Sequence, residues 1–325
     1  MRKQEIIFSG NHGQLCQDFV NYKRSLGYNY DVRQCYSVKY LCDHLNECGD
    51  ATTGLPRNIV EDFICHKGSE SSTTQSKRVF IIRQLGIYMN SIDRTSYIPP
   101  FDYVKPDKSF TPYIYTKDEI AAIIEESEKL KALRKWPNSH LVYPMILRIL
   151  FGCGLRISET LNLTEADIDL QNGTIYIGKS KFNNSRIVPM AAGLWEYCAE
   201  YYKKVGHYPS DGQYFFEVSY GKPYRSESIY CRFRTILAQA GIIHNGRGNG
   251  PRLHDARHTY AVYALEQMVQ QGMDIYCALP ILSTYLGHRT IESTEKYVRL
   301  VPAFHESIIN SMSDIYKGLF PEVAL

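Results

Sequence analysis

The chain has 325 residues, a net charge of +3 and nine cysteines. This length accommodates two domains with separate cores, whereas the charge is too small to indicate nucleic-acid binding unless the basic residues are clustered. The cysteines form no Cys-x-x-Cys pair and no Cys/His cluster at zinc spacing, which favours reduced thiols over a disulfide framework and predicts no metal site.

Membrane insertion and export are not expected. No segment approaches the roughly 18 consecutive apolar residues that a membrane span needs, and the N-terminus has no apolar signal region. We therefore expect a cytoplasmic protein without a membrane partner.

The first predicted elements are four short helices. Apolar residues recur at helical spacing in residues 11–26, 32–48, 57–66 and 73–91. The pattern predicts a small all-α domain over residues 1–97.

The fourth of these helices carries polar residues beside an apolar stripe. Readout of base edges needs several polar groups on one side of a helix, and we expect Thr74, Lys77 and Arg78 to share that side. The alternative is an ordinary solvated helix face. The candidate DNA-binding residues are Thr74, Gln75, Lys77, Arg78 and Arg83.

Residues 98–115 contain four prolines and predict an extended linker. Directly after it, Thr116 and Glu119 have the spacing of a capping box, which predicts a helix that opens a second domain over residues 116–325. Further on, residues 173–178 alternate like a strand, and residues 185–189 predict its hairpin partner. Residues 226–237 predict a basic amphipathic helix.

Three frames in the second domain carry side chains that suit phosphate chemistry. A lone arginine is usually a surface residue and a lone tyrosine usually packs in a core, so each frame is weak evidence by itself. Their ordered combination is far more specific. The frames are residues 152–159, 253–261 and 286–297, and they contain Arg156, His254, Arg257, His288 and Tyr297.

These residue types fit the breaking and rejoining of a DNA phosphodiester. The negative charge of the phosphate grows in the transition state, and arginine and histidine donors can stabilise it. A tyrosine phenolate that attacks phosphorus forms a covalent phosphotyrosine and releases a 5′-hydroxyl. The bond energy is kept, so the reaction needs no ATP and no metal cofactor.

The frames resemble the signature boxes of the tyrosine recombinases, the family of phage integrases, Xer-type resolvases and transposon enzymes. The resemblance implies a helical core-binding (SAM-like) domain followed by a catalytic domain, mainly α with a small antiparallel sheet, which together form an α+β protein. It implies that Tyr297 is the nucleophile and that the other four residues bind the phosphate.

The general acid is also implied by the resemblance. Family members carry a lysine on the hairpin, eight residues before a proline, and this position corresponds to Lys181 before Pro189. Lys179, which follows Gly178, remains an alternative. Glu159 is either an orienting residue for Arg156 or His254, or an ordinary helix carboxylate.

The implied partner is double-stranded DNA with paired recombination sites, bound by a homotetramer that exchanges strands through a four-way junction and acts with accessory recombination proteins. Such a protein is associated with the nucleoid when bound to DNA. Residues 272–288 look like the version in transposon-borne members, which favours an integrase or transposase over a dimer resolvase. The apolar face after Pro302 predicts a C-terminal tail helix that docks on a neighbouring protomer or on its own domain.

Two other functions are compatible with these residues. A type IB topoisomerase uses a related set of side chains to relax supercoiled DNA as a monomer. A catalytically silent DNA-binding protein could instead regulate a partner recombinase.

Overall fold

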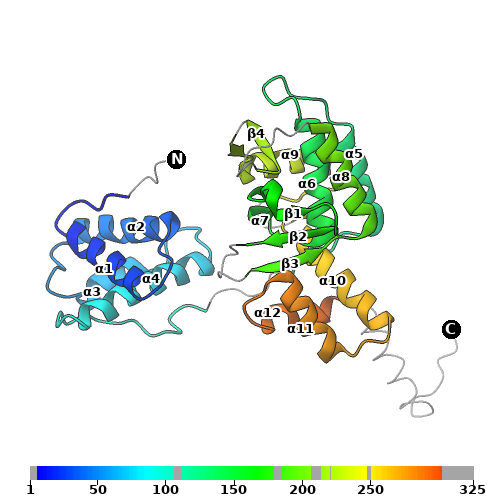
Figure 1. Ribbon diagram of the computed structural model, residues 1–325. Helices are drawn as coiled ribbons and strands as arrows, with labels where there is room; N and C mark the ends of the chain where they lie inside the picture. Colours follow the sequence, from blue (N-terminus) through cyan, green and yellow to red (C-terminus); the bar gives the residue numbers. More distant parts are fainter. Residues whose placement is uncertain are drawn as a thin grey trace, which may run out of the picture. The chain divides into compact units, whose positions relative to one another are not determined.

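The computed structural model describes residues 6–105, 111–178, 185–205, 214–219, 221–246 and 250–301 (Figure 1). The chain divides into two compact units, Met1–Phe110 and Thr111–Leu325. The predicted tail helix after Pro302 and the two candidate lysines, Lys179 and Lys181, lie outside the described residues.

The first unit is a bundle of four helices, as the apolar periodicity predicts. Asp31 and Ser71 cap the second and fourth helices by accepting backbone N–H groups of the first turn. One apolar core joins all four helices and includes Phe19, Leu41 and Phe63. The helices are α1 (Gly13–Ser25), α2 (Val32–Cys48), α3 (Arg57–Ile64) and α4 (Ser72–Asn90).

The second unit is mainly helical with two small antiparallel sheets. The capping box of Thr116 and Glu119 is present and opens its first helix, as predicted. The helices are α5 (Lys117–Glu128), α6 (Ser139–Cys153), α7 (Ile157–Leu161), α8 (Ala192–Val205), α9 (Ser226–Gln239), α10 (Asp255–Gln270), α11 (Ile275–Leu286) and α12 (Glu292–Glu295), with 3-10 turns at Glu165–Asp167 and Val298–Leu300.

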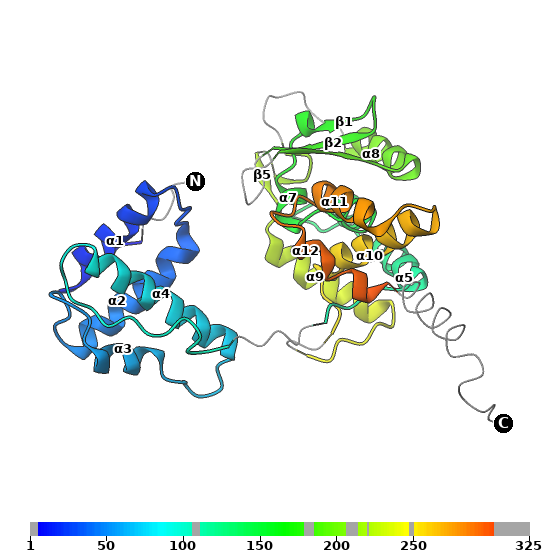
Figure 2. The ribbon, with the colours of Figure 1, turned by 90° about the horizontal axis from the view of Figure 1, so that it is seen from below.

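The predicted hairpin is the centre of the larger sheet. Strands β2 (Thr174–Ile177) and β3 (Arg186–Pro189) pair antiparallel with Ile177 opposite Arg186, and β1 (Ile168–Asp169) adds to the other edge of β2. Strands β4 (Glu217–Ser219) and β5 (Lys222–Pro223) form the second sheet. Figures 1 and 2 show α10, α11 and α12 gathered beside one another, and the contacts of α10 with α11 and of α11 with α12 agree.

The extended linker predicted over residues 98–115 is too long at both ends. Val104, inside the predicted linker, packs against the core of the first unit, as does Tyr97 just before the linker. Tyr115 is buried in the second unit, where its backbone N–H donates to Thr259 Oγ1 (3.0 Å) and its hydroxyl donates to the carbonyl of Arg252 (3.0 Å). Prolines exclude regular structure here, but they do not stop aromatic neighbours from packing.

The expectations of reduced thiols and of no membrane span both came from the composition. All nine cysteines lie in described residues and are free thiols. Among the described helices, none has the length and apolar character that a membrane span requires.

Candidate active site

Three arginines meet at the C-terminal end of α11. The last carbonyls of a helix have no partner within it and carry partial negative charge, so they attract cations. Arg186 Nε donates to the carbonyl of Tyr285 (2.8 Å), Arg257 Nη2 to that of Leu286 (2.6 Å), and Arg156 Nη2 to that of Gly287 (3.1 Å). Guanidinium groups from the start of α7, from β3 and from α10 therefore converge on three successive peptide groups.

Gly287 makes this arrangement possible. It ends α11 in the left-handed region, with a φ of 65°, a conformation that glycine adopts without the steric cost of a Cβ. A Cβ at this position would lie 2.8 Å from Arg186 Nη1. A larger residue would therefore strain the turn and displace a guanidinium.

Glu159 holds the same arginines from the opposite side. Its carboxylate accepts hydrogen bonds from Arg156 Nη1 (2.7 Å) and from both terminal nitrogens of Arg186 (3.1 and 2.9 Å), and it lies 4.0 Å from Arg257 Nη1. Burial alone would raise its pKa, but Arg186 and Arg156 lower the pKa of Glu159 to about 2. Glu159 is therefore a buried carboxylate that contacts Arg156, one of the two residues it was expected to orient.

Replacement of Glu159 by glutamine should destabilise the protein and remove part of its acid sensitivity. The folded-state pKa of about 2 lies below the ordinary 4.5, so the ionised carboxylate contributes stability above pH 4.5 that is lost as the pH falls toward 2. Breaking a buried ion pair from one side costs about 3–5 kcal/mol. Urea unfolding of Glu159→Gln and of the native chain at pH 7 and pH 3 measures both effects.

The exposed Glu125, which pairs with Lys129 on the surface, provides the control. Glu125→Gln should change the free energy of unfolding by less than about 1 kcal/mol. Equal losses in the two variants would contradict the central position of Glu159.

The candidate histidines are neutral near pH 7. Loss of hydration and the charge of Arg257 lower the pKa of His254, directly before α10, to about 4. The same two causes lower the pKa of His288 to about 3. His288 Nδ1 is hydrogen-bonded to Thr294 Oγ1 (2.8 Å), and its ring stacks on that of Tyr297 with centroids 6.2 Å apart.

Tyr297 is buried, with 1% of its surface exposed. It packs in the apolar cluster formed by α10 and α11, which includes Val262, Leu265 and Leu282. Its hydroxyl is hydrogen-bonded to Nδ1 of His258 (3.0 Å). Burial raises the pKa of Tyr297 to about 12, although Arg257 and Arg156 act in the opposite direction.

Comparison with known proteins identifies the family. Residues 114–303, more than half of the chain, match the profile of the Phage integrase family. The chain belongs to the phage integrase family. This recombinase is therefore an enzyme that breaks and rejoins DNA.

Relatives of known sequence cover nearly the whole recombinase. It is 29% identical over 296 residues to y4rB of Sinorhizobium fredii, a protein named as an integrase/recombinase, with 88% of this chain and 91% of the relative covered. It is 26% identical over 254 residues to the tyrosine recombinase XerC of Staphylococcus carnosus, with 75% of this chain and 76% of XerC covered.

Solved structures confirm the fold. The XerH recombinase bound to a palindromic difH substrate matches with a TM-score of 0.67 at 18% identity, covering 95% of this chain and 86% of XerH. The Tn1549 transposon integrase matches with a TM-score of 0.59 at 18% identity, covering 87% of this chain and 94% of that integrase. The predicted fold class, mainly α with a small antiparallel sheet, is confirmed.

The structure brings together the five residues of the three frames and adds two that the sequence analysis missed. Arg186 belongs to the predicted strand, but strand alternation does not show that its side chain joins Arg156 and Arg257. His258 follows Arg257 directly and lies one helical turn after His254, with the two rings 5.0 Å apart. Its position in the frame and the i, i+4 spacing could have indicated it.

Arg78 does not join Thr74 and Lys77 as an exposed group on α4, contrary to expectation. Thr74 and Lys77 are exposed, whereas Arg78 is only 7% exposed and its guanidinium binds Glu70 and the carbonyls of Phe63 and Cys65. These carbonyls belong to the end of the short helix α3, where a helix leaves acceptors without intrahelical donors.

Two further members of the predicted DNA-binding set also face protein groups. Gln75 Nε2 donates to the carbonyl of Ile64 (3.0 Å), again at the end of α3. Arg83 is half-buried and donates to the carbonyl of Pro99. Of the five candidates, Thr74 and Lys77 are therefore the ones with exposed side chains.

Proposed function

We propose that this recombinase cleaves duplex DNA at specific sites through a 3′-phosphotyrosyl intermediate on Tyr297, without metal or ATP, within a tetramer that pairs two sites. The observation that carries the proposal is the convergence of three arginines on the end of α11, beside a tyrosine that contacts His288 and His258. Solved complexes of XerH with difH before and after cleavage support duplex DNA as the substrate.

The charges of this cluster suit a phosphoryl transition state. Arg156, Arg186 and Arg257 contribute three positive charges and Glu159 one negative charge, while the histidines are neutral. The resulting excess of two positive charges matches a phosphate that gains negative charge as the nucleophile arrives. Donors that are already oriented stabilise such a charge without further reorganisation.

The first step forms a bond between Tyr297 Oη and phosphorus and breaks the bond from phosphorus to the 5′-oxygen. Tyr297 gives up its hydrogen bond to His258 as it attacks, and its phenolic proton passes to water. The leaving 5′-oxygen takes a proton from Lys181, or from Lys179 in the alternative assignment. Attack of a 5′-hydroxyl on the phosphotyrosine reverses these transfers and rejoins the strand.

A covalent trap tests this function. The full-length protein is incubated in EDTA with DNA from the flanks of its own gene, nicked so that the cleaved end diffuses away. We expect a denaturant-stable complex in which the protein is joined to a DNA 3′-phosphate. A strict requirement for magnesium would contradict the proposal, and relaxation of any supercoiled plasmid without paired sites would favour a type IB topoisomerase. Absence of a covalent complex on every DNA would favour a silent DNA-binding partner.

Thr74 and Lys77 are proposed to contact base edges. Lys77→Ala should weaken binding by about 1–3 kcal/mol on the cognate site and by much less on a site changed at the contacted base pair. Arg78→Ala should instead lower the stability of the first unit and weaken binding to all sites alike, because Arg78 joins α3 to α4. Fluorescence anisotropy on a set of substituted sites, together with urea unfolding, separates these outcomes.

Lys129→Ala, on the surface of the second unit, serves as the control and should keep native site preference. If Thr74 and Lys77 are both replaced and the order of preference among sites is unchanged, base readout lies elsewhere.

A further inference from the structure

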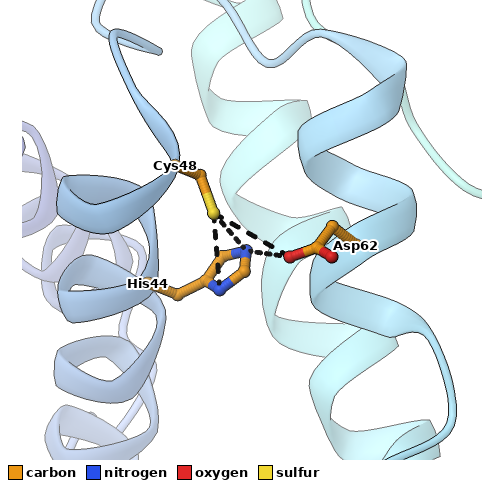
Figure 3. A group of neighbouring side chains, drawn as sticks. All are labelled: His44, Cys48 and Asp62. Carbon is orange, nitrogen blue, oxygen red and sulfur yellow. Dashed lines mark hydrogen bonds and ion pairs between the residues drawn. The ribbon is translucent and has the colours of Figure 1, made fainter.

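Three potential metal ligands meet between α2 and α3 (Figure 3). His44 and Cys48 lie one helical turn apart on α2, so their side chains leave the same face of the helix. Asp62 comes from α3 and points toward them. The sequence analysis did not identify this group, because Asp62 lies 14 residues after Cys48 in the chain.

The separations of the ligand atoms are those of a tetrahedral metal site. His44 Nε2 lies 3.4 Å from Cys48 Sγ and 3.5 Å from Asp62 Oδ2, and Cys48 Sγ lies 3.9 Å from Asp62 Oδ2. Tetrahedral zinc with bonds of about 2.0–2.3 Å to nitrogen, oxygen and sulfur requires separations of roughly 3.3–3.6 Å between its ligands. Side-chain shifts of a few tenths of an ångström would complete the geometry.

The three groups differ in their exposure to solvent. His44 is largely buried, and its ring packs against that of Phe63, with the ring centroids 5.0 Å apart. Asp62 is 63% exposed at its side chain, so the group can be reached from solvent.

We propose that His44, Cys48 and Asp62 bind one Zn²⁺ ion, with water as the fourth ligand. Imidazole, thiolate and carboxylate together in a tetrahedral arrangement favour zinc over magnesium or calcium, which prefer oxygen ligands in larger numbers. The Cys48 thiol gives up its proton to solvent on binding.

The ion would join α2 to α3 and thereby stabilise the first unit. The carbonyls at the end of α3 hold Gln75 and Arg78 of α4, so an ion that fixes α3 also supports the helix on which Thr74 and Lys77 lie. This role goes beyond the proposed recombinase chemistry, because every candidate catalytic residue belongs to the other unit.

Cobalt spectroscopy tests the site on the full-length protein. Co²⁺ is added after treatment with a chelator, and its absorption reports tetrahedral coordination and a thiolate bond. We expect saturation at one equivalent and displacement by Zn²⁺. Cys48→Ser and Asp62→Asn should each weaken cobalt binding by about tenfold or more. Loss of a residue that only hydrogen-bonds to a metal ligand already lowers the affinity by about this factor.

Cys65→Ser is the matched control, because Cys65 is also an exposed thiol, located directly after α3. It should retain the cobalt spectrum, and Zn²⁺ should raise the melting temperature of this control and of the native chain but not of Cys48→Ser. A native chain without a thiolate band, or a Cys48→Ser variant that binds as the native chain does, would overturn the proposal. Either result leaves the covalent trap on Tyr297 unaffected.

Discussion

Tyr297→Phe should abolish covalent attachment to DNA while the protein still binds its site. The substitution removes the single oxygen that would attack phosphorus and leaves the aromatic packing between α10 and α11 intact. The variant also loses the hydrogen bond to His258, at a cost of about 1 kcal/mol in unfolding free energy. Denaturing electrophoresis of the nicked-substrate reaction measures attachment, and anisotropy measures binding.

Tyr285→Phe provides the matched control. Tyr285 is the nearest earlier tyrosine in the chain, and its hydroxyl donates to the carbonyl of Pro189 (3.3 Å). This variant should still form the covalent complex. A 3′-phosphotyrosyl adduct on the Tyr297→Phe protein would show that another residue is the nucleophile.

Arg257→Ala should slow cleavage by about two orders of magnitude or more, the loss expected when a preorganised donor to a developing oxyanion is removed. Arg257 is only 3% exposed and donates to the carbonyls of Gly154 and Leu286. Its removal therefore leaves buried acceptors unpaired and also reduces stability. Single-turnover cleavage at saturating DNA, with circular dichroism at the same temperature, separates the chemical loss from unfolding.

Arg257→Lys keeps the charge but replaces the planar guanidinium fork, which spans the carbonyls of Gly154 and Leu286, with a compact ammonium. It should fold better than the alanine variant and still cleave slowly. Arg134→Ala, an exposed arginine between α5 and α6, should cleave at the native rate. Native-like cleavage by Arg257→Lys would mean that charge alone is required at this position.

The sequence predicts the elements better than it predicts the partners of their polar side chains. Apolar periodicity locates α1 to α4 within a few residues, and alternation locates β2 and β3, because both depend on burial along a single element. The burial of Arg78 depends on the carbonyls at the end of α3. This helix has 8 residues, and the periodicity does not resolve its end.

In the candidate active site too, local sequence features were predictable and contacts between elements were not. The ordered frames indicate Arg156, Arg257 and Tyr297, because residue type and spacing are local properties of the chain. Arg186 is brought to the site by the pairing of β3 with β2, and Asp62 reaches His44 by the packing of two helices. Contacts between side chains of different elements depend on tertiary structure, which the sequence pattern of one element does not predict.

The hydrogen bonds that hold the three arginines to the end of α11 bear on which step limits the rate. The arginines are already in place, so a phosphate can enter without rearranging its cationic contacts. Tyr297, in contrast, must leave an apolar pocket and its partner His258 before it can reach phosphorus. Release of the tyrosine is then expected to be slower than bond formation, as in many enzymes where a conformational change limits turnover. A better leaving group would then leave the native rate unchanged, and release of the tyrosine would set the timing of each strand exchange.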